Sequence, residues 1–222
     1  MSTILVVAPH PDDETLGSGG TLLRHKADGD ELHWLIVTDM TEKSGFSEAQ
    51  IDAREKELAS VEKAYGFSSV TRLGFPATRL DEVTLGDVIN AMGEAFTKIS
   101  PNTLYVPFSG DVHSEHRISF EAVSACCKCF RHPGIQQVIA CEISSETDFG
   151  IDPSRQAFRP NLFVDISAHL DEKIRIMETY DGEMGAFPFP RSPEAIRALA
   201  TLRGSQAGCS AAEAFMILKE IR

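Results

Sequence analysis

Short apolar runs alternate with longer, mixed segments along most of the chain. Residues 4–8 (ILVVA) are continuously apolar, as is typical of a strand that is buried on both faces. Residues 47–65 instead have apolar positions at helical spacing, such as Ile51 and Leu58. The apolar runs predict strands at residues 4–8, 32–38, 70–73, 103–106, 137–141 and 162–166.

The segments between these runs predict the helices. We expect helices at residues 15–26, 47–65, 85–99, 118–130, 168–180 and 194–202. Strands that alternate with helices predict an α/β fold, a mostly parallel sheet with helices on both faces. Residues 182–193 contain three prolines and predict a loop. Its Phe187–Pro190 stretch is a candidate lid, although we favour an ordinary connection. No internal repeat or linker is visible, so we expect a single domain over residues 1–222.

Composition restricts the partners and the compartment. Lys and Arg number 21 against 33 Asp and Glu, a net charge of −12, which disfavours nucleic acid as a partner. A small anionic substrate stays compatible with this charge. No apolar run approaches the ~18 residues of a membrane helix, and the N-terminus lacks the features of a signal peptide. The five cysteines do not form a disulfide framework. We therefore expect a cytoplasmic protein without stable membrane insertion.

The turn after the first strand contains a histidine and three acidic residues, His10 followed by Asp12, Asp13 and Glu14. In an open α/β sheet, ligands bind at the carboxyl ends of the strands. Adjacent carboxylates repel one another unless a cation or hydrogen-bond donors lie among them. Capping of a helix N-terminus explains one or two of the acids but not His10. The turn therefore predicts a metal site.

A dinucleotide site is the competing interpretation of this region, because Gly17-Ser18-Gly19-Gly20 follows the first strand. The sixth position of a G-x-G-x-x-G motif that starts at Gly17 is Leu22, however. The preceding acids would also face the pyrophosphate. We expect the glycines to permit close packing of the helix on the sheet instead.

A second polar cluster, residues 109–117, follows the fourth strand and contains His113 and His116. Loops after central strands of a parallel sheet converge, so His10, Asp13 and one of these histidines would form a group of three ligands. Three protein ligands and an open position are typical of catalytic zinc, although a mixed N/O site also accepts Fe²⁺, Mn²⁺ or Co²⁺. Asp12 is then left over as a general base.

The two clusters together resemble motifs of the LmbE/PIG-L family of N-acetylglucosaminyl deacetylases. The family turn A-H-P-D-D-E is present here as Ala8-Pro9-His10-Pro11-Asp12-Asp13-Glu14, with Pro9 inserted. The family motif H-x-D-H is present as His113-Ser114-Glu115-His116, with Glu115 in place of Asp. The likeness extends to Gly19-Gly20, Arg54, Leu73-Gly74, residues 203–206 and residues 212–215.

The resemblance implies a Rossmann-like sheet, a possible homo-oligomer and a role for each site residue. It implies zinc bound by His10, Asp13 and His116, Asp12 as general base, His113 as stabiliser of the oxyanion and Arg54 as a substrate contact. We expect Glu14 and Glu115 beside the ligands, with Glu115 favouring the charged form of His113.

These residues support a zinc-dependent N-deacetylase as the first hypothesis. Its substrate would be an N-acetylglucosamine-type sugar, a sugar conjugate or a nucleotide sugar, and its products acetate and the free amine. The same residues would serve an amidase of a sugar-thiol conjugate or another small amide. A third hypothesis is a non-enzymatic metal-binding or interaction protein, which Asp12 disfavours because a storage site needs no spare base.

Overall fold

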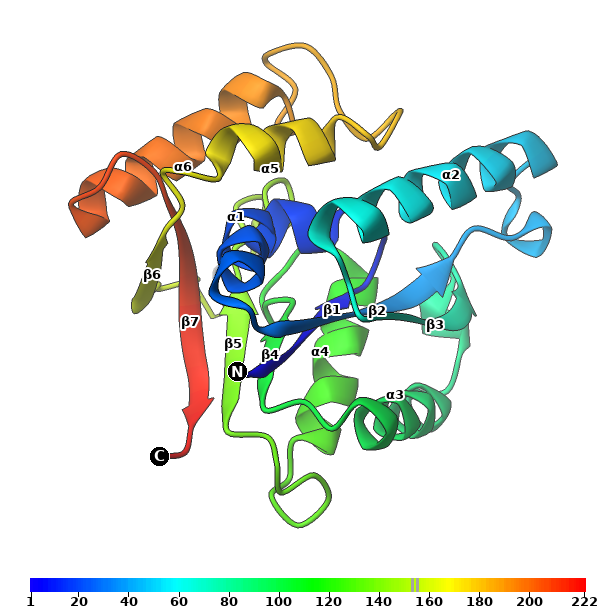
Figure 1. The fold of residues 1–222 in the computed structure, drawn as a ribbon. Helices are drawn as coiled ribbons and strands as arrows, with labels where there is room; N and C mark the ends of the chain where they lie inside the picture. The colour runs from blue at the N-terminus through cyan, green and yellow to red at the C-terminus, as the bar shows by residue number, and fades with distance from the viewer. Residues whose placement is uncertain (153, 155) are drawn as a thin grey trace.

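The six predicted strands and one further strand form one seven-stranded sheet within the part of the chain that the computed structural model describes, residues 1–152, 154 and 156–222 (Figure 1). The strand order is β3-β2-β1-β4-β5-β7-β6. Strands β1 to β5 pair in parallel, and β7 is antiparallel to both of its neighbours. The strands are β1 (Thr3–Ala8), β2 (Glu31–Asp39), β3 (Ser69–Pro76), β4 (Thr103–Val106), β5 (Gln137–Cys141), β6 (Leu162–Asp165) and β7 (Ala212–Glu220).

Helices cover both faces of the sheet, as expected for an α/β fold (Figure 1). Alternate strand residues point to opposite faces, so each face has its own core. Ile4 and Val6 pack with α1, α2, α5 and α6, whereas Leu5 and Val7 pack with α3 and α4. The helices are α1 (Asp13–Asp28), α2 (Glu48–Tyr65), α3 (Leu85–Ile99), α4 (Ser114–Cys126), α5 (Leu170–Met177) and α6 (Pro193–Ala207), with short 3₁₀ turns η1 (Glu42–Ser44) and η2 (Leu80–Glu82).

The C-terminal strand β7 is an element that the sequence pattern did not predict. It begins Ala212-Glu213-Ala214, a stretch with helical rather than strand propensity. Pairing on both sides, with β5 and β6, outweighs this local preference. The chain after α6 therefore returns into the sheet.

Helix α4 begins four residues before its predicted start at residue 118, at Ser114. The cause is a local cap, because the His113 side chain accepts a hydrogen bond from the backbone N–H of Glu115. The His113–His116 motif consequently forms the first turn of the helix.

Strand β1 lies between β2 and β4 in the sheet, so successive crossovers leave it in opposite directions. This is the switch point, where an open α/β sheet leaves a crevice beyond its strand ends. The β1–α1 and β4–α4 turns meet there. Among the described residues, no helix combines the length and the apolar character that a bilayer crossing requires.

Candidate metal centre and active site

The β1–α1 turn has a tightly specified backbone. Asp12 has φ 128° and ψ −28°, a conformation that non-glycine residues rarely adopt. The N–H of Asp12 donates to Glu14 Oε2 over 3.0 Å, and the N–H of His10 donates to Asp13 Oδ2 over 2.8 Å. The acidic side chains thus stabilise the turn that carries them.

Glu14 is completely buried and directly follows the ligand candidate Asp13. Its Oε1 accepts hydrogen bonds from the Tyr180 hydroxyl at 2.7 Å and from the Thr15 hydroxyl at 2.6 Å. Burial raises the pKa of Glu14 to about 7, although these hydrogen bonds oppose the shift. The position of Glu14 makes it a support for the Asp12 backbone.

The first turn of α4 supplies the second half of the site. His116 is completely buried, and its Nδ1 lies 2.9 Å from Asp111 Oδ2. The other Asp111 oxygen accepts a hydrogen bond from the Thr147 hydroxyl at 2.7 Å. A carboxylate that holds one histidine nitrogen directs the other nitrogen toward a metal.

His10, Asp13 and His116 converge on one point. Asp13 Oδ2 lies 3.3 Å from His10 Nδ1 and 3.2 Å from His116 Nε2. One ligand atom from each of the three residues lies within 4.8 Å of the others. His116 Nε2 is buried and has no hydrogen-bond partner among the described residues. A buried orphan nitrogen that faces a carboxylate and a second imidazole fits a divalent metal ion.

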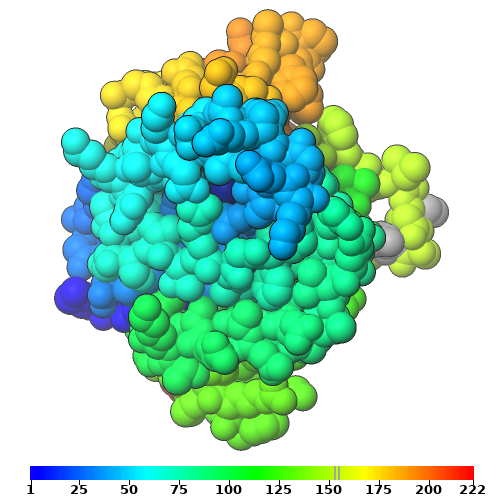
Figure 2. Space-filling view, turned by 90° about the vertical axis from the view of Figure 1, so that its right-hand side faces the viewer, coloured from blue at the N-terminus to red at the C-terminus, as the bar shows by residue number. Residues whose placement is uncertain are grey.

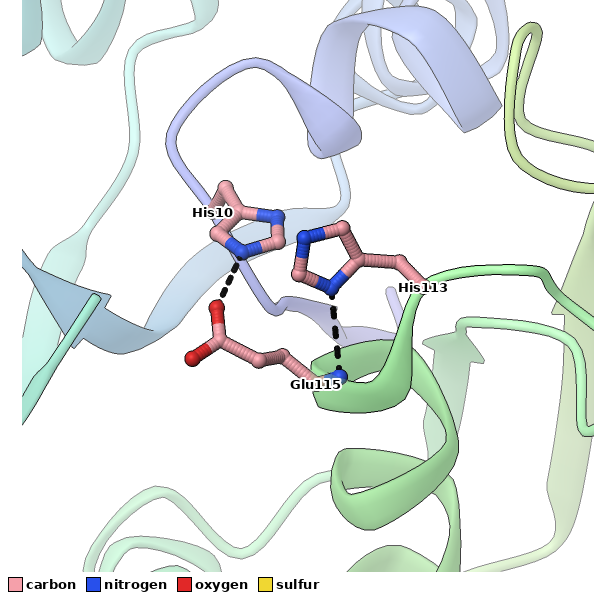
Figure 3. Close-up of side chains that lie close together, drawn as sticks. All are labelled: His10, His113 and Glu115. Atoms are coloured by element: carbon pink, nitrogen blue, oxygen red, sulfur yellow. Dashed lines mark hydrogen bonds and ion pairs between the residues drawn. The ribbon is translucent and has the colours of Figure 1, made fainter. Parts of the chain in front are cut away.

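His10, His113 and Glu115 form an overlapping group, shown in Figure 3. Glu115 Oε2 lies 2.6 Å from His10 Nε2, and its Oε1 accepts the N–H of Leu80. We expected Glu115 to favour the charged form of His113. Its carboxylate does raise the pKa of that ring, but its direct contact is with His10. The contact leaves His10 Nδ1 for the metal, so His10 and His116 each have a supporting carboxylate.

The surrounding charges favour protonation of both histidines when no metal is bound. Burial alone would lower the pKa of His10, but Asp13 and Glu115 outweigh it and raise the value to about 9. Burial also opposes the shift at His116, where Asp13 and Asp111 raise the pKa to about 10. The carboxylates that raise these two pKa values would equally favour a bound metal cation.

The pKa of His113 shifts in the opposite direction, downward. Burial, followed by the positive charges of His10 and His116, lowers its pKa to about 4. Its Nδ1 accepts the N–H of Glu115, so the proton of the neutral ring is on Nε2 (Figure 3). In the metal-free protein the His113 ring is therefore a neutral donor rather than the charged group that we expected.

A pocket of about 250 Å³ opens onto Asp12, His10 and His113. Asp12 Oδ2 lies 2.7 Å from Arg191 Nη1. Burial and the neighbouring Asp13 raise the pKa of Asp12, while Arg191 opposes the shift. Asp12 is thus a buried carboxylate at the floor of a pocket, next to the metal group.

Arg54 is at the wall of this pocket, but only 6% of its surface is exposed. It donates to the Pro11 carbonyl at 3.3 Å and to Glu183 at 2.6 Å, and its guanidinium lies over the Tyr180 ring. These contacts make Arg54 a support of the β1–α1 turn as well as part of the wall.

Arg191, Glu146 and Glu183 line the pocket and were missed in the sequence. Glu183 and Arg191 follow no strand end and belong to no motif, so only the tertiary structure reveals them. Glu146 lies in the loop after β5, where the rule that ligands bind at strand ends could have indicated it. Asp111 was inside the second cluster without an assigned role. Arg203, which is part of the family likeness, lies elsewhere and is paired with Glu142.

Backbone strain also gathers at this site. Positive φ angles occur at Asp12 and Thr78, which line the pocket, and at Ser145, which contacts Arg191. Strained residues persist only where the surrounding structure holds them, and they cluster at functional sites.

An α/β sheet with a His–Asp–His group and a further carboxylate at its switch point has the arrangement of a metal-dependent hydrolase. Comparisons with known proteins agree. A family model described as PIG-L, GlcNAc-PI de-N-acetylase, matches residues 5–127. The chain is 25% identical over 232 residues to diacetylchitobiose deacetylase of Thermococcus kodakarensis, with 95% of this chain and 80% of that protein covered.

Two further proteins are similar over different lengths. A probable N-acetyl-α-D-glucosaminyl L-malate deacetylase 2 of Bacillus anthracis is 26% identical over 129 residues, which cover 54% of this chain and 57% of that protein. The crystal structure of the conserved protein TT1542 from Thermus thermophilus superimposes with a TM-score of 0.76 and 26% identity, covering 100% of this chain and 97% of that one.

The family match covers more than half of the chain, so this protein belongs to the PIG-L family. Its relatives are named deacetylases, which confirms the expectation of a hydrolytic enzyme.

Proposed function

We propose that this protein is a zinc-dependent N-deacetylase that releases acetate and a free amine from an N-acetylglucosamine-type sugar, sugar conjugate or nucleotide sugar. The observation that carries the proposal is the orphan Nε2 of His116, which faces His10 and Asp13 beside the carboxylate of Asp12. The names of the relatives, a diacetylchitobiose deacetylase and a glucosaminyl malate deacetylase, support this substrate class.

We assign His10, Asp13 and His116 as the metal ligands. Two imidazoles and one carboxylate suit Zn²⁺, and they also accept Fe²⁺, Mn²⁺ or Co²⁺. When bound, the cation supplies Lewis-acid polarisation of the amide carbonyl and of the attacking water. Glu115 and Asp111 orient the two histidines from behind.

The remaining side chains have separate tasks in this mechanism. Asp12 takes the proton of the attacking water and returns it to the leaving amine. His113 donates its Nε2–H to the oxygen that becomes negatively charged. Arg54, at the pocket wall, contacts the sugar while holding the Pro11 carbonyl.

The test is acetate release by zinc-loaded protein from N-acetylglucosamine, diacetylchitobiose, N-acetylglucosaminyl malate and a nucleotide sugar. Asp12→Asn should keep the metal and lose about 10²–10⁴ of the turnover, the usual contribution of a general base. His116→Ala should lose the metal as measured by elemental analysis. Zinc-loaded wild type that releases no acetate from any of these compounds would contradict the proposal.

The products also decide between the two hydrolase hypotheses. A free thiol or a larger acid instead of acetate would identify an amidase of a sugar-thiol conjugate or another small amide. The cytoplasmic location, the homo-oligomer and the single domain stay predictions, which cell fractionation, light scattering and limited proteolysis can test.

A further inference from the structure

The connection between α5 and α6, residues 178–192, reaches back over the proposed active site. We call it the α5–α6 segment; it lies outside residues 5–127, which the family model matches. Figure 2 shows this region in orange at the top of the face that also presents α2 in blue and cyan. Two of its side chains, Glu183 and Arg191, line the pocket.

Arg191 is anchored by several partners at once. Its Nη1 lies 2.7 Å from Asp12 Oδ2 and 3.1 Å from Glu183 Oε2. Its Nε–H donates to the Ser145 hydroxyl at 2.9 Å, and its Nη2 lies 3.4 Å from Glu146 Oε1. Only 17% of the side chain is exposed. A planar guanidinium that is bound on three of its nitrogens has a fixed orientation.

The same segment also holds the backbone of Asp12. The Tyr180 hydroxyl donates to Glu14 Oε1 at 2.7 Å, and Glu14 Oε2 accepts the N–H of Asp12 at 3.0 Å. Asp12 needs such support because its φ of 128° is unfavourable for a residue with a side chain. The α5–α6 segment thus constrains Asp12 through its main chain and through its carboxylate.

Arg191 engages only one oxygen of that carboxylate. The other oxygen, Oδ1, has no hydrogen-bond partner among the described residues, whereas Oδ2 is bound to Arg191. One oxygen therefore serves as an anchor, and the second remains available to accept a proton. A general base must be held within hydrogen-bond reach of the proton that it takes.

We propose that Arg191 is a positioning residue that fixes the Asp12 carboxylate through Oδ2 and leaves Oδ1 free to act as the base. This inference rests on the proposed function, in which Asp12 is the base. Arg191 has most of its donors engaged with the protein, so its main effect is on the chemical step rather than on substrate binding.

The test compares Arg191→Gln and Arg191→Lys with wild type and with the matched control Arg197→Ala. Arg197 is on α6, where it pairs with the exposed Asp171 away from the pocket. In Arg191→Gln we expect kcat for acetate release from diacetylchitobiose to fall about 10²-fold, the size of effect that a misplacement of ~1 Å produces. KM and zinc content should stay near the wild-type values, and Arg197→Ala should match wild type.

Two rescues separate positioning from a general loss of structure. Arg191→Lys should have a higher kcat than Arg191→Gln but a lower one than wild type. The lysine ammonium can reach Asp12, but it cannot reproduce the planar set of hydrogen-bond donors of the guanidinium. Millimolar guanidinium should raise kcat of Arg191→Gln and leave wild type and Arg197→Ala unchanged. An unchanged kcat in Arg191→Gln, or a rise in KM alone, would overturn the inference.

A crystal structure of the zinc-loaded wild type provides a readout that does not depend on activity. We expect Arg191 Nη1 to remain on Asp12 Oδ2, and a guanidinium turned away from Asp12 would overturn the inference. If zinc-loaded wild type releases no acetate from any compound, the proposed function fails, and this structure still decides whether Arg191 holds Asp12.

Discussion

The roles of individual side chains at this site depend on which nitrogen or oxygen is already occupied. His10 binds Glu115 through Nε2, and its Nδ1 faces Asp13 at the proposed metal site. His116 binds Asp111 through Nδ1, and its Nε2 faces Asp13 at the same site. The residue types were predictable from the two motifs. The choice of atom was not, because it depends on partners brought from other parts of the chain.

Asp111 should control the affinity for the metal through His116. In Asp111→Asn, the hydrogen bond to Nδ1 is weakened or reversed, so we expect the zinc affinity to fall about 10–100-fold. Competition with a chromogenic chelator measures this affinity. Asp87→Asn, an exposed carboxylate on α3, is the control and should bind zinc as wild type does. Equal affinities in both variants would show that Asp111 does not support the ligand.

His113 should act as a neutral donor over the whole working range of pH. Its pKa is lowered to about 4, so raising the pH from about 5 to about 9 leaves its charge unchanged. We expect His113→Ala to lose about 10²–10³ in kcat, typical for loss of one donor to an oxyanion. His113→Gln, which can still donate, should lose less. If kcat of wild type changed with pH near 6.5 and kcat of the two His113 variants did not, the result would instead indicate a charged His113.

At the scale of the elements, the glycines of α1 explain how the helix approaches the sheet. A Cβ on Gly20 would lie 2.7 Å from Ile166 Cγ2, and one on Gly17 would lie 2.9 Å from Cys141 Cβ. The prediction that these glycines permit close packing is confirmed. Close packing of α1 on the sheet positions the turn before it, which carries His10 and Asp13.

Gly20→Ala should therefore destabilise the protein, because Ile166 is buried and has little room to move. We expect a loss of about 1–3 kcal/mol in the free energy of unfolding, the usual range for overpacking. Gly86→Ala on α3 is the matched control, since its Cβ would meet only the Thr84 hydroxyl at 3.8 Å. Alanine at this position should stabilise the protein by about 0.4–1 kcal/mol, chiefly because it reduces the conformational freedom of the unfolded chain. Urea unfolding of both variants measures the two effects.

At the scale of the whole molecule, ionisation links the site to folding. His10 and His116 have an ordinary pKa of 6.5 that folding raises to about 9 and about 10 in the metal-free protein. The folded state then holds protons that the unfolded chain releases. The stability from these histidines is complete below pH 6.5 and is lost as the pH rises through their folded values. Folding also raises the pKa of Glu14, from 4.5 to about 7, so its contribution to stability is likewise lost as the pH rises, between about 4.5 and about 7.

Metal-free protein should consequently lose stability as the pH increases from 6.5 to about 9, as measured by urea unfolding after chelation. Zinc binding requires the unprotonated nitrogens, so its affinity should rise over the same window. In His116→Ala, both the loss of stability and the rise in zinc affinity across this pH window should be smaller than in wild type. A metal-free stability that is constant or increases across this window would contradict the assigned ionisation.

The sequence by itself determined the α/β class, six of the seven strands, and the two turns that carry the histidines and acids. These features depend on local periodicity and on the rule that parallel strands present their carboxyl ends at one edge. Only the tertiary structure decided the pairing of β7 with β5, the partner of Glu115 and the contact of Arg191 with Asp12. Each of these joins residues more than 70 positions apart, and packing rather than local pattern selects such contacts.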